Sequence, residues 1–175
     1  MKSLRKCFAG FHWRGNSNIT WRNVLERVRK ISSYQFGEDI GEKLFPDHIK
    51  VLFSKKTGRI KYIYLGEELL AALNPITGLF TLTIEGARRV FSSMGRKRLW
   101  VKVDDSVIPF IEAGNDVFAK HVVDADEEIR PREEVIVIDD DENIVAVGKA
   151  LLSGHEMKTF RRGVAVKVRK GRCER

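Results

Sequence analysis

The last stretch of the chain concentrates side chains that can bind a polyanion. It reads Arg161-Arg162-Gly163-Val164-Ala165-Val166-Lys167-Val168-Arg169-Lys170-Gly171. Valine recurs at every second position from Val164 to Val168, which predicts a strand with basic residues on its other face. Arg and Lys neutralise phosphates, and this contribution to affinity falls as the salt concentration rises. The pattern therefore favours nucleic acid as a partner of the final strand.

Carboxylates gather between Asp124 and Glu142, where ten acidic residues occur. A metal site needs oxygen ligands that converge on one point. The run Asp139-Asp140-Asp141 instead separates two apolar stretches, and Asp is favoured in turns for its own local hydrogen bonds. We interpret the segment as a solvated acidic turn, and we expect neither a metal ion nor any other cofactor.

Other candidate catalytic groups are scattered along the chain. The four histidines are His12, His48, His121 and His155. No two of them have the spacing of a zinc site, and Cys7 with His12 would supply only half of one. Ser153-Gly154-His155 lacks the strand-to-helix elbow of a serine nucleophile, so we interpret it as a loop between two strands. We therefore expect no catalytic residue.

Charge divides the chain into two parts. The formal net charge is +8, and 43% of the residues are hydrophobic, which is enough to build real cores. Residues 1–99 hold 19 basic and 8 acidic residues, whereas residues 100–175 hold 13 and 16. The two cysteines, Cys7 and Cys173, predict no disulfide framework and suit a reducing compartment, so we expect a cytoplasmic protein. No apolar run is long enough to span a membrane.

The first half of the chain predicts a small domain of helices and strands over residues 1–97. Apolar residues recur at three- and four-residue steps from Trp21 to Ile31, which predicts a helix capped by Asn18 or Thr20. The elements predicted next are a helix over 39–44, a hairpin of strands 49–54 and 59–65, a helix over 67–73, a strand over 78–83 and a helix over 85–93. Residues 95–98 form a basic linker. Residues 1–18 are basic and irregular, which is typical of a flexible arm, but the aromatic residues Phe8, Phe11 and Trp13 indicate that part of this segment docks.

The second half, residues 98–175, predicts a barrel of short strands. Its helix is expected to start at Asp104 or Asp105, to bury Val107, Phe110 and Ile111, and to end at Gly114. The strands are predicted over 99–103, 117–123, 135–138, 144–152 and 163–169. The fold class is therefore α+β, with a small N-terminal α/β domain followed by a C-terminal β pseudobarrel.

The second half resembles the PUA domain, a pseudobarrel RNA-binding module of RNA-modifying enzymes. The matching segments, in order, are Ser106-Val107-Ile108-Pro109-Phe110, Gly114, Val117-Phe118-Ala119, Ile129-Arg130-Pro131, Glu134-Val135, Val147-Gly148-Lys149-Ala150 and Gly163-Val164-Ala165-Val166. Their order makes the resemblance specific to this family.

The first half is similar to the domain that precedes the PUA in archaeal tRNA-guanine transglycosylase. The segments that carry this similarity are Tyr34-Gln35-Phe36-Gly37, Leu44-Phe45-Pro46, Thr57-Gly58-Arg59-Ile60, Gly78-Leu79-Phe80-Thr81-Leu82 and Glu85-Gly86-Ala87-Arg88-Arg89. That family exchanges guanine for a 7-deazaguanine base in tRNA on a separate catalytic barrel with a zinc site. This sequence shows neither the cysteine cluster nor the aspartate motif of that barrel, so we do not expect it to perform the exchange alone.

The PUA resemblance also implies where RNA would bind. One wall would hold Phe110, Gly114, Asp116, Phe118, Lys120 and His121, and the other would hold Arg161, Arg162, Lys167, Arg169 and Lys170. Apolar neighbours favour core positions for Phe110 and Phe118, and a structural role is favoured for His121. The basic hairpin tip with Lys55, Lys56 and Arg59 is either a second RNA contact or a solvated turn.

These features predict a non-catalytic accessory in RNA modification that binds structured RNA, with tRNA as the expected partner. One alternative is the tRNA-binding subunit of a split archaeal tRNA-guanine transglycosylase, with the catalytic subunit as a protein partner. A second is a ribosome-assembly factor that binds rRNA. A third, an enzyme in its own right, has only the acidic segment as support.

Overall fold

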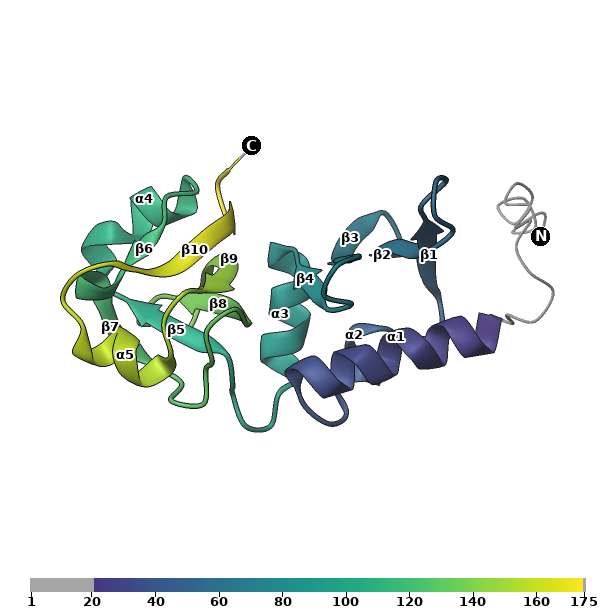
Figure 1. The fold of residues 1–175 in the computed structure, drawn as a ribbon, viewed down its shortest axis with the longest axis horizontal. Coiled ribbons are helices and arrows are strands. Elements are labelled where there is room, and N and C mark those ends of the chain that lie inside the picture. The colour runs from purple at the N-terminus through teal and green to yellow at the C-terminus, as the bar shows by residue number, and fades with distance from the viewer. Residues whose placement is uncertain (1–20, 175) are drawn as a thin grey trace, which may run out of the picture.

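The computed structural model describes residues 21–174, which form two domains arranged end to end (Figure 1). Helices and strands mix in both, and the predicted α+β class, an N-terminal helix-and-sheet domain before a C-terminal pseudobarrel, is confirmed. The expected arm at residues 1–18, the proposed caps Asn18 and Thr20, and the pair Cys7 and His12 lie outside the described residues. Within residues 21–174, no helix has both the length and the apolar character needed to cross a membrane.

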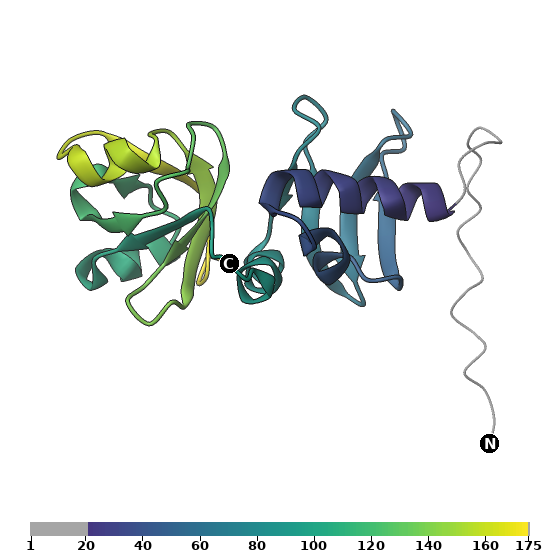
Figure 2. The same ribbon diagram turned by 90° about the horizontal axis from the view of Figure 1, so that it is seen from below.

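The N-terminal domain is a four-stranded antiparallel sheet with helices packed on it. Its elements are α1 (Trp21–Phe36), α2 (Ile40–Leu44), β1 (Ile49–Phe53), β2 (Ile60–Leu65), β3 (Glu68–Leu73), β4 (Phe80–Leu82) and α3 (Ile84–Ser93), with strand order β1-β2-β3-β4. Helix α1 lies across one face of the sheet (Figure 2) and buries Val24, Leu25 and Val28, members of the apolar stripe seen in the sequence. Phe45 packs edge-on against Phe80, with ring centroids 5.2 Å apart.

The helix predicted over 67–73 is wrong, because this segment is strand β3. Leu and Ala favour helices in isolation, but a helix of this length gains little by itself. Gly66, at φ +61°, makes the tight turn that folds the segment back on β2. Pairing with β2 and β4 then buries Leu70 and Ala71 completely, so packing in the sheet overrides the local preference.

The C-terminal domain is a barrel-like sheet of six strands. Its elements are β5 (Trp100–Val103), the 3₁₀ turn η1 (Asp105–Val107), α4 (Ile108–Glu112), β6 (Val117–Phe118), the 3₁₀ turn η2 (Ala119–His121), β7 (Val122–Ala125), β8 (Glu134–Ile138), β9 (Ile144–Ala150), α5 (Gly154–Thr159) and β10 (Val164–Gly171). The strand order is β6-β10-β9-β8-β5-β7, in which only the β5–β8 pair is parallel.

The single strand predicted over 117–123 is interrupted. Strand β6 pairs with β10, whereas β7 pairs with β5 at the other end of the strand order. Because β6 and β7 lie at opposite ends of the nearly closed sheet, the chain must change direction between them, and η2 provides the bend. Periodicity alone does not reveal such a break, because the apolar pattern continues through it.

The loop predicted at Ser153-Gly154-His155 is also wrong, because α5 begins there. Ser153 is its N-cap, and its hydroxyl accepts a hydrogen bond from the Glu156 backbone N–H. The Glu156 carboxylate accepts in return from the Ser153 backbone N–H at 2.8 Å, which completes a capping box. The Ser-x-x-Glu spacing of Ser153 and Glu156 is a capping-box pattern, and it could have predicted this helix start from the sequence.

Strand β4 forms one edge of the N-terminal sheet, and side chains form hydrogen bonds with its outward-facing backbone groups. Gln35 Nε2 donates to the Phe80 carbonyl at 2.7 Å, and Gln35 Oε1 accepts from the Phe80 N–H at 2.8 Å. The Leu82 N–H donates to Glu134 Oε1 at 2.9 Å, and Arg169 Nη2 donates to the Leu82 carbonyl. Because Glu134 and Arg169 belong to the barrel, these bonds join the two domains.

Glu134 is the buried charged centre of this junction. Its carboxylate is almost completely buried and pairs with Arg169, whose Nη1 donates to Oε2 at 3.0 Å. Burial raises the pKa of Glu134 to about 7, and the opposing influence of Arg169 and the Leu82 N–H does not restore its ordinary value of 4.5. The folded protein therefore holds the Glu134 proton more tightly than the unfolded chain.

We expect Glu134 to make the stability of the protein depend on pH. Its contribution is fully present below pH about 4.5 and is lost as the pH rises through about 7. Between these values the free energy of unfolding of the wild type should fall relative to that of Glu134→Gln, by up to about 3 kcal/mol. Urea unfolding of both proteins at the two ends of this range measures the difference. A gap that stays constant with pH would contradict the raised pKa.

Candidate nucleic-acid interface

Basic side chains meet where β6 runs beside the start of β10. Phe118 is the register partner of Val164, and the Ala119 N–H donates to the Gly163 carbonyl at 3.0 Å. This pairing brings Lys120, in η2, close to the loop that holds Arg161 and Arg162. All three side chains are exposed, and none forms an ion pair among residues 21–174. We call these three cations the basic corner.

Two rings expected in the core lie on the surface instead. Phe110 is 61% exposed and Phe118 is 47% exposed. Helix α4 is one short turn in which Ile111 faces inward, so Phe110 points away from the core. Strand β6 has two residues, and alternation buries Val117 and turns Phe118 outward. The core interpretation was therefore wrong, and both rings are available for stacking on bases.

A third exposed aromatic residue of the C-terminal domain, Phe160, was missed in the sequence. It follows the last residue of α5, is 45% exposed and directly precedes Arg161 and Arg162. An aromatic residue beside two arginines is the composition of a single-strand binding surface, and this adjacency was visible in the sequence.

Asp116 and Gly114 position the loop after α4. The Asp116 carboxylate accepts from the Val168 N–H at 3.0 Å and from Lys167 Nζ at 2.8 Å, so it ties the loop to β10. Gly114 adopts φ +98°, and a Cβ there would lie 3.2 Å from the Glu174 carboxyl carbon. Asp116 thus supports the surface and also holds the Lys167 side chain.

The second predicted wall divides into free and engaged cations. Arg169 turns toward the junction, where it binds Glu134 and the Leu82 carbonyl. Lys170 Nζ donates to the Glu174 carbonyl at 2.6 Å. The free charge of this wall therefore lies at its Arg161 end, together with Lys120 and beside the half-buried His121 of η2.

The basic hairpin tip lies far from this corner. Lys55, Lys56 and Arg59 are exposed at the turn between β1 and β2, at the opposite end of the molecule from α4 (Figure 1). Gly58, at φ +66°, provides the backbone conformation for that turn. The structure does not bring the two basic regions together, so one RNA would have to extend along the molecule to touch both.

The carboxylates of the acidic turn do not form a metal site. Asp139 accepts from the Asn143 N–H at 2.7 Å, and two neighbouring carboxylates meet lysines, Glu142 with Lys97 and Asp140 with Lys102. Across the described part of the chain, no group of three or more His, Cys, Asp or Glu side chains is placed to hold a metal ion. His121 lies on η2 and His155 on α5, and neither belongs to such a group.

Comparison with protein families accounts for both domains. Residues 26–96 match the patch-forming domain C2 of tRNA-guanine transglycosylase, and residues 100–172 match the PUA domain. This chain joins a transglycosylase C2 domain to a PUA domain. The two form an RNA-binding region homologous to the C-terminal part of archaeal tRNA-guanine transglycosylases, which confirms the resemblance found in the sequence.

Individual relatives match most of this chain. The tRNA-guanine(15) transglycosylase of Methanothermobacter thermautotrophicus is 41% identical over 147 residues, which are 84% of this chain and 22% of the relative. That of Thermococcus kodakarensis is 44% identical over 144 residues, 82% of this chain and 24% of the relative. The chain thus spans about a quarter of the length of the curated relatives it matches.

Solved structures share the fold of the C2 and PUA domains. A hypothetical protein of Pyrococcus horikoshii superposes with a TM-score of 0.69 at 27% identity, covering 87% of this chain and 92% of that one. A conserved PUA domain protein of Thermoplasma acidophilum gives a TM-score of 0.62 at 20% identity, covering 87% and 91%. The second comparison supports the fold alone.

We expect Phe110→Ala to separate binding from stability. Because the ring is largely exposed, its loss should change the free energy of unfolding by only about 0.5 kcal/mol. Loss of a stacking partner should weaken RNA binding about 5- to 100-fold. The matched control is Ile111→Ala on the same turn, which is 2% exposed and should lose about 2–5 kcal/mol of stability. Unchanged RNA affinity in Phe110→Ala would exclude the ring from the interface.

Proposed function

We propose that this chain binds tRNA through the basic corner of its PUA domain and supplies the tRNA-binding part of a guanine-exchanging transglycosylase. The observation that carries the proposal is the match of both domains, in the same order, to a tRNA-guanine(15) transglycosylase at 41% identity over 147 residues. The base exchange itself is an activity of the whole relatives, which are about four times as long as the matched region.

The surface supports this proposal by its chemistry. Lys120, Arg161 and Arg162 offer unpaired positive charge to phosphates, and Phe118 and Phe160 offer exposed rings beside them. Structured RNA is recognised mainly by shape and by phosphate and 2′-hydroxyl contacts, with aromatic rings stacking on unpaired bases. We propose the same site residues as in the sequence, with two exceptions: Arg169 joins the two domains, and Asp116 ties the loop after α4 to β10.

A second function follows from the limited share of the relatives that the chain matches. We propose that it acts together with a catalytic transglycosylase domain, whether on the same polypeptide or on a partner. In this arrangement the C2 domain sets the distance between the tRNA-binding surface and the catalytic unit, and we place its boundary with the PUA domain between residues 97 and 98. Co-purification with a catalytic transglycosylase from the same cell would support this arrangement.

The test of tRNA binding compares two triple variants with equal changes in charge. Lys120→Ala/Arg161→Ala/Arg162→Ala should weaken tRNA binding and reduce the slope of log affinity against log salt by about 2 to 3. The control, Arg22→Ala/Lys30→Ala/Lys50→Ala, removes three exposed cations of the C2 domain and should change the slope much less. Titrations at about 50 and about 200 mM salt measure both.

Two outcomes of this test would contradict the proposal. Equal losses in the two variants would mean that tRNA senses only the net charge of the chain. Tighter binding to ribosomal RNA fragments than to tRNA would instead favour a role in ribosome assembly.

The hairpin tip makes a separate prediction. If the same tRNA extends to the C2 domain, Lys55→Ala/Lys56→Ala/Arg59→Ala should reduce the salt slope by a further amount of about 1 to 3. The glycine turn stays intact in this variant, so the unfolding midpoint should not change. A salt slope equal to that of the wild type would identify the tip as a solvated turn.

A further inference from the structure

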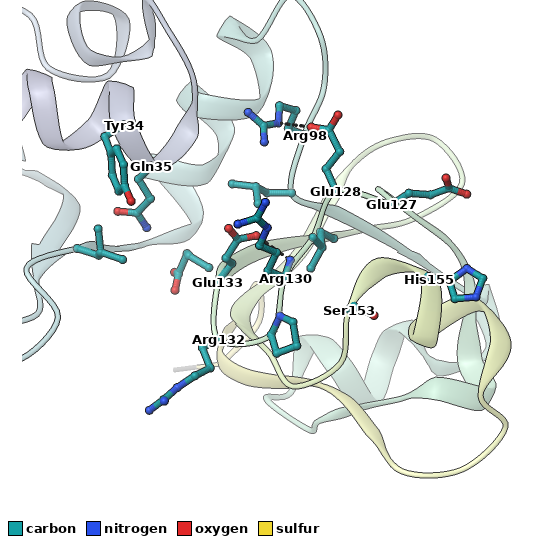
Figure 3. A pocket seen from close by; sticks show the side chains of 15 residues that line it. Tyr34, Gln35, Arg98, Glu127, Glu128, Arg130, Arg132, Glu133, Ser153 and His155 are labelled. Atoms are coloured by element: carbon teal, nitrogen blue, oxygen red, sulfur yellow. Dashed lines mark hydrogen bonds and ion pairs between the residues drawn. The ribbon is translucent and has the colours of Figure 1, made fainter.

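A cavity of about 1000 Å³ lies between the two domains, apart from the basic corner. The last turn of α1 forms one wall, and the loop that precedes β8 forms the other. Figure 3 shows Tyr34 and Gln35 on the first wall, facing Arg130 and Glu133 across the opening. Its volume suits a ligand of nucleotide size or larger.

Both walls are fixed to the same strand. Gln35 binds the backbone of Phe80 through two hydrogen bonds, of 2.7 and 2.8 Å, and this anchors the end of α1. Glu134, at the end of the opposite wall, accepts from the Leu82 N–H at 2.9 Å. Because Phe80 and Leu82 both belong to β4, the cavity keeps its width without a bound ligand.

Most of the acidic side chains that line the cavity are already paired with cations. Cations pair with three of them, Lys158 with Glu127, Arg96 and Arg98 with Glu128, and Arg169 with Glu134. Glu133 accepts a hydrogen bond from the Arg130 backbone N–H at 2.9 Å and keeps its negative charge. The side chains of Arg130 and Arg132 are exposed, and no ion pair engages either of them within residues 21–174. The charges without an ion-pair partner are thus Arg130, Arg132 and Glu133, and their balance is positive, as an anionic ligand requires.

Tyr34 gives the cavity an aromatic surface. It is 83% exposed, although its neighbour Gln35 is held in place and Phe36 is buried. A ring this open gains little from packing, so its position serves stability poorly. Aromatic side chains on rigid elements are the usual platforms on which unpaired bases stack.

Backbone strain supports a functional role for this cavity. Two of its lining residues, Leu99 at φ +59° and Arg132 at φ +80°, adopt the left-handed conformation that glycine normally occupies. Each such residue costs of order 1–3 kcal/mol, and strained residues cluster at binding and catalytic sites. The Arg132 N–H donates to the Ala150 carbonyl at 2.7 Å, which holds the strained turn.

We propose that this cavity binds an unpaired nucleotide of the RNA, with its base stacked on Tyr34 and its phosphate bound by Arg130 and Arg132. The proposal rests on RNA binding by the chain as a whole, and it adds a second site between the two domains. An unpaired nucleotide supplies both features that the cavity offers, a flat apolar face and an adjacent negative charge. An acidic peptide would use the arginines and leave the ring without a partner.

The decisive experiment measures tRNA affinity of full-chain variants. Tyr34→Ala should weaken binding about 5- to 100-fold, whereas Tyr34→Phe keeps the ring and should bind like the wild type. Ile76→Ala is the matched control, because this side chain is 92% exposed at the turn between β3 and β4. None of the three should lower the unfolding midpoint.

Arg132→Gly tests the phosphate contact and the strain together. Glycine adopts φ +80° freely, so the variant should be at least as stable as the wild type while it loses the cation. The salt slope should fall by about 0.7 to 0.9, the amount for one phosphate contact. Lower affinity with a smaller salt slope in a variant of undiminished stability would support the phosphate contact, and an unchanged slope would overturn it.

The outcomes separate this inference from the proposed function. Wild-type affinity in Tyr34→Ala, with loss in the variant of the basic corner, would overturn the cavity and leave tRNA binding intact. If the wild type binds no RNA, adenosine 5′-monophosphate and polyglutamate are the probes. Nucleotide binding that Tyr34→Ala abolishes would support the cavity, and polyglutamate binding that only Arg132→Gly abolishes would assign it to an acidic peptide.

Discussion

The arrangement of this molecule depends on how one short edge strand satisfies its backbone. The outward N–H and C=O groups of Phe80 and Leu82 all bind side chains, from Gln35, Glu134 and Arg169. Buried backbone groups must find partners, and here the partners come from a helix and from the neighbouring barrel. The same four bonds therefore end the sheet, anchor α1 and set the orientation of the PUA domain.

This solution places a charged pair where an apolar contact would also have filled the space. Removing Glu134 and Arg169 from water is costly, and their attraction offsets that cost only with good geometry and further hydrogen bonds. Each group also binds the backbone of Leu82, but the pKa of Glu134 stays raised to about 7, so the attraction does not offset the whole cost of burial. An apolar contact would let the domains slide, whereas directional bonds allow one register. We therefore expect the pair to fix the relative position of the two domains.

Much of the fold follows from sequence patterns, and the exceptions have physical causes. The stripe of α1, the hairpin from Ile49 to Leu65 and the valines of β10 were evident from periodicity. Strand β3 was not, because its composition favours a helix until β2 and β4 pair with it. Periodicity also cannot tell that Phe110, on a helix of one turn, faces water.

The candidate site, like the fold, could be predicted where it depends on residues close in the sequence. It could not be predicted where it depends on distant partners. The sequence places the basic residues at the end of the chain and the exposed pair of arginines beside Phe160. It cannot tell which cations are free, since that depends on partners far away, such as Glu134 for Arg169 across 35 positions. The cavity beside Tyr34 is invisible for the same reason, because its walls come from different domains.

The saturated edge of β4 also bears on the solubility of the N-terminal domain. Without the barrel, the backbone groups of Leu82 would lose Glu134 and Arg169, and the sheet would end in an open strand. Such an edge is a template on which another chain can add a strand, and folded proteins usually cover it. By covering the edge of β4, the PUA domain therefore also protects the N-terminal domain from self-association through this strand.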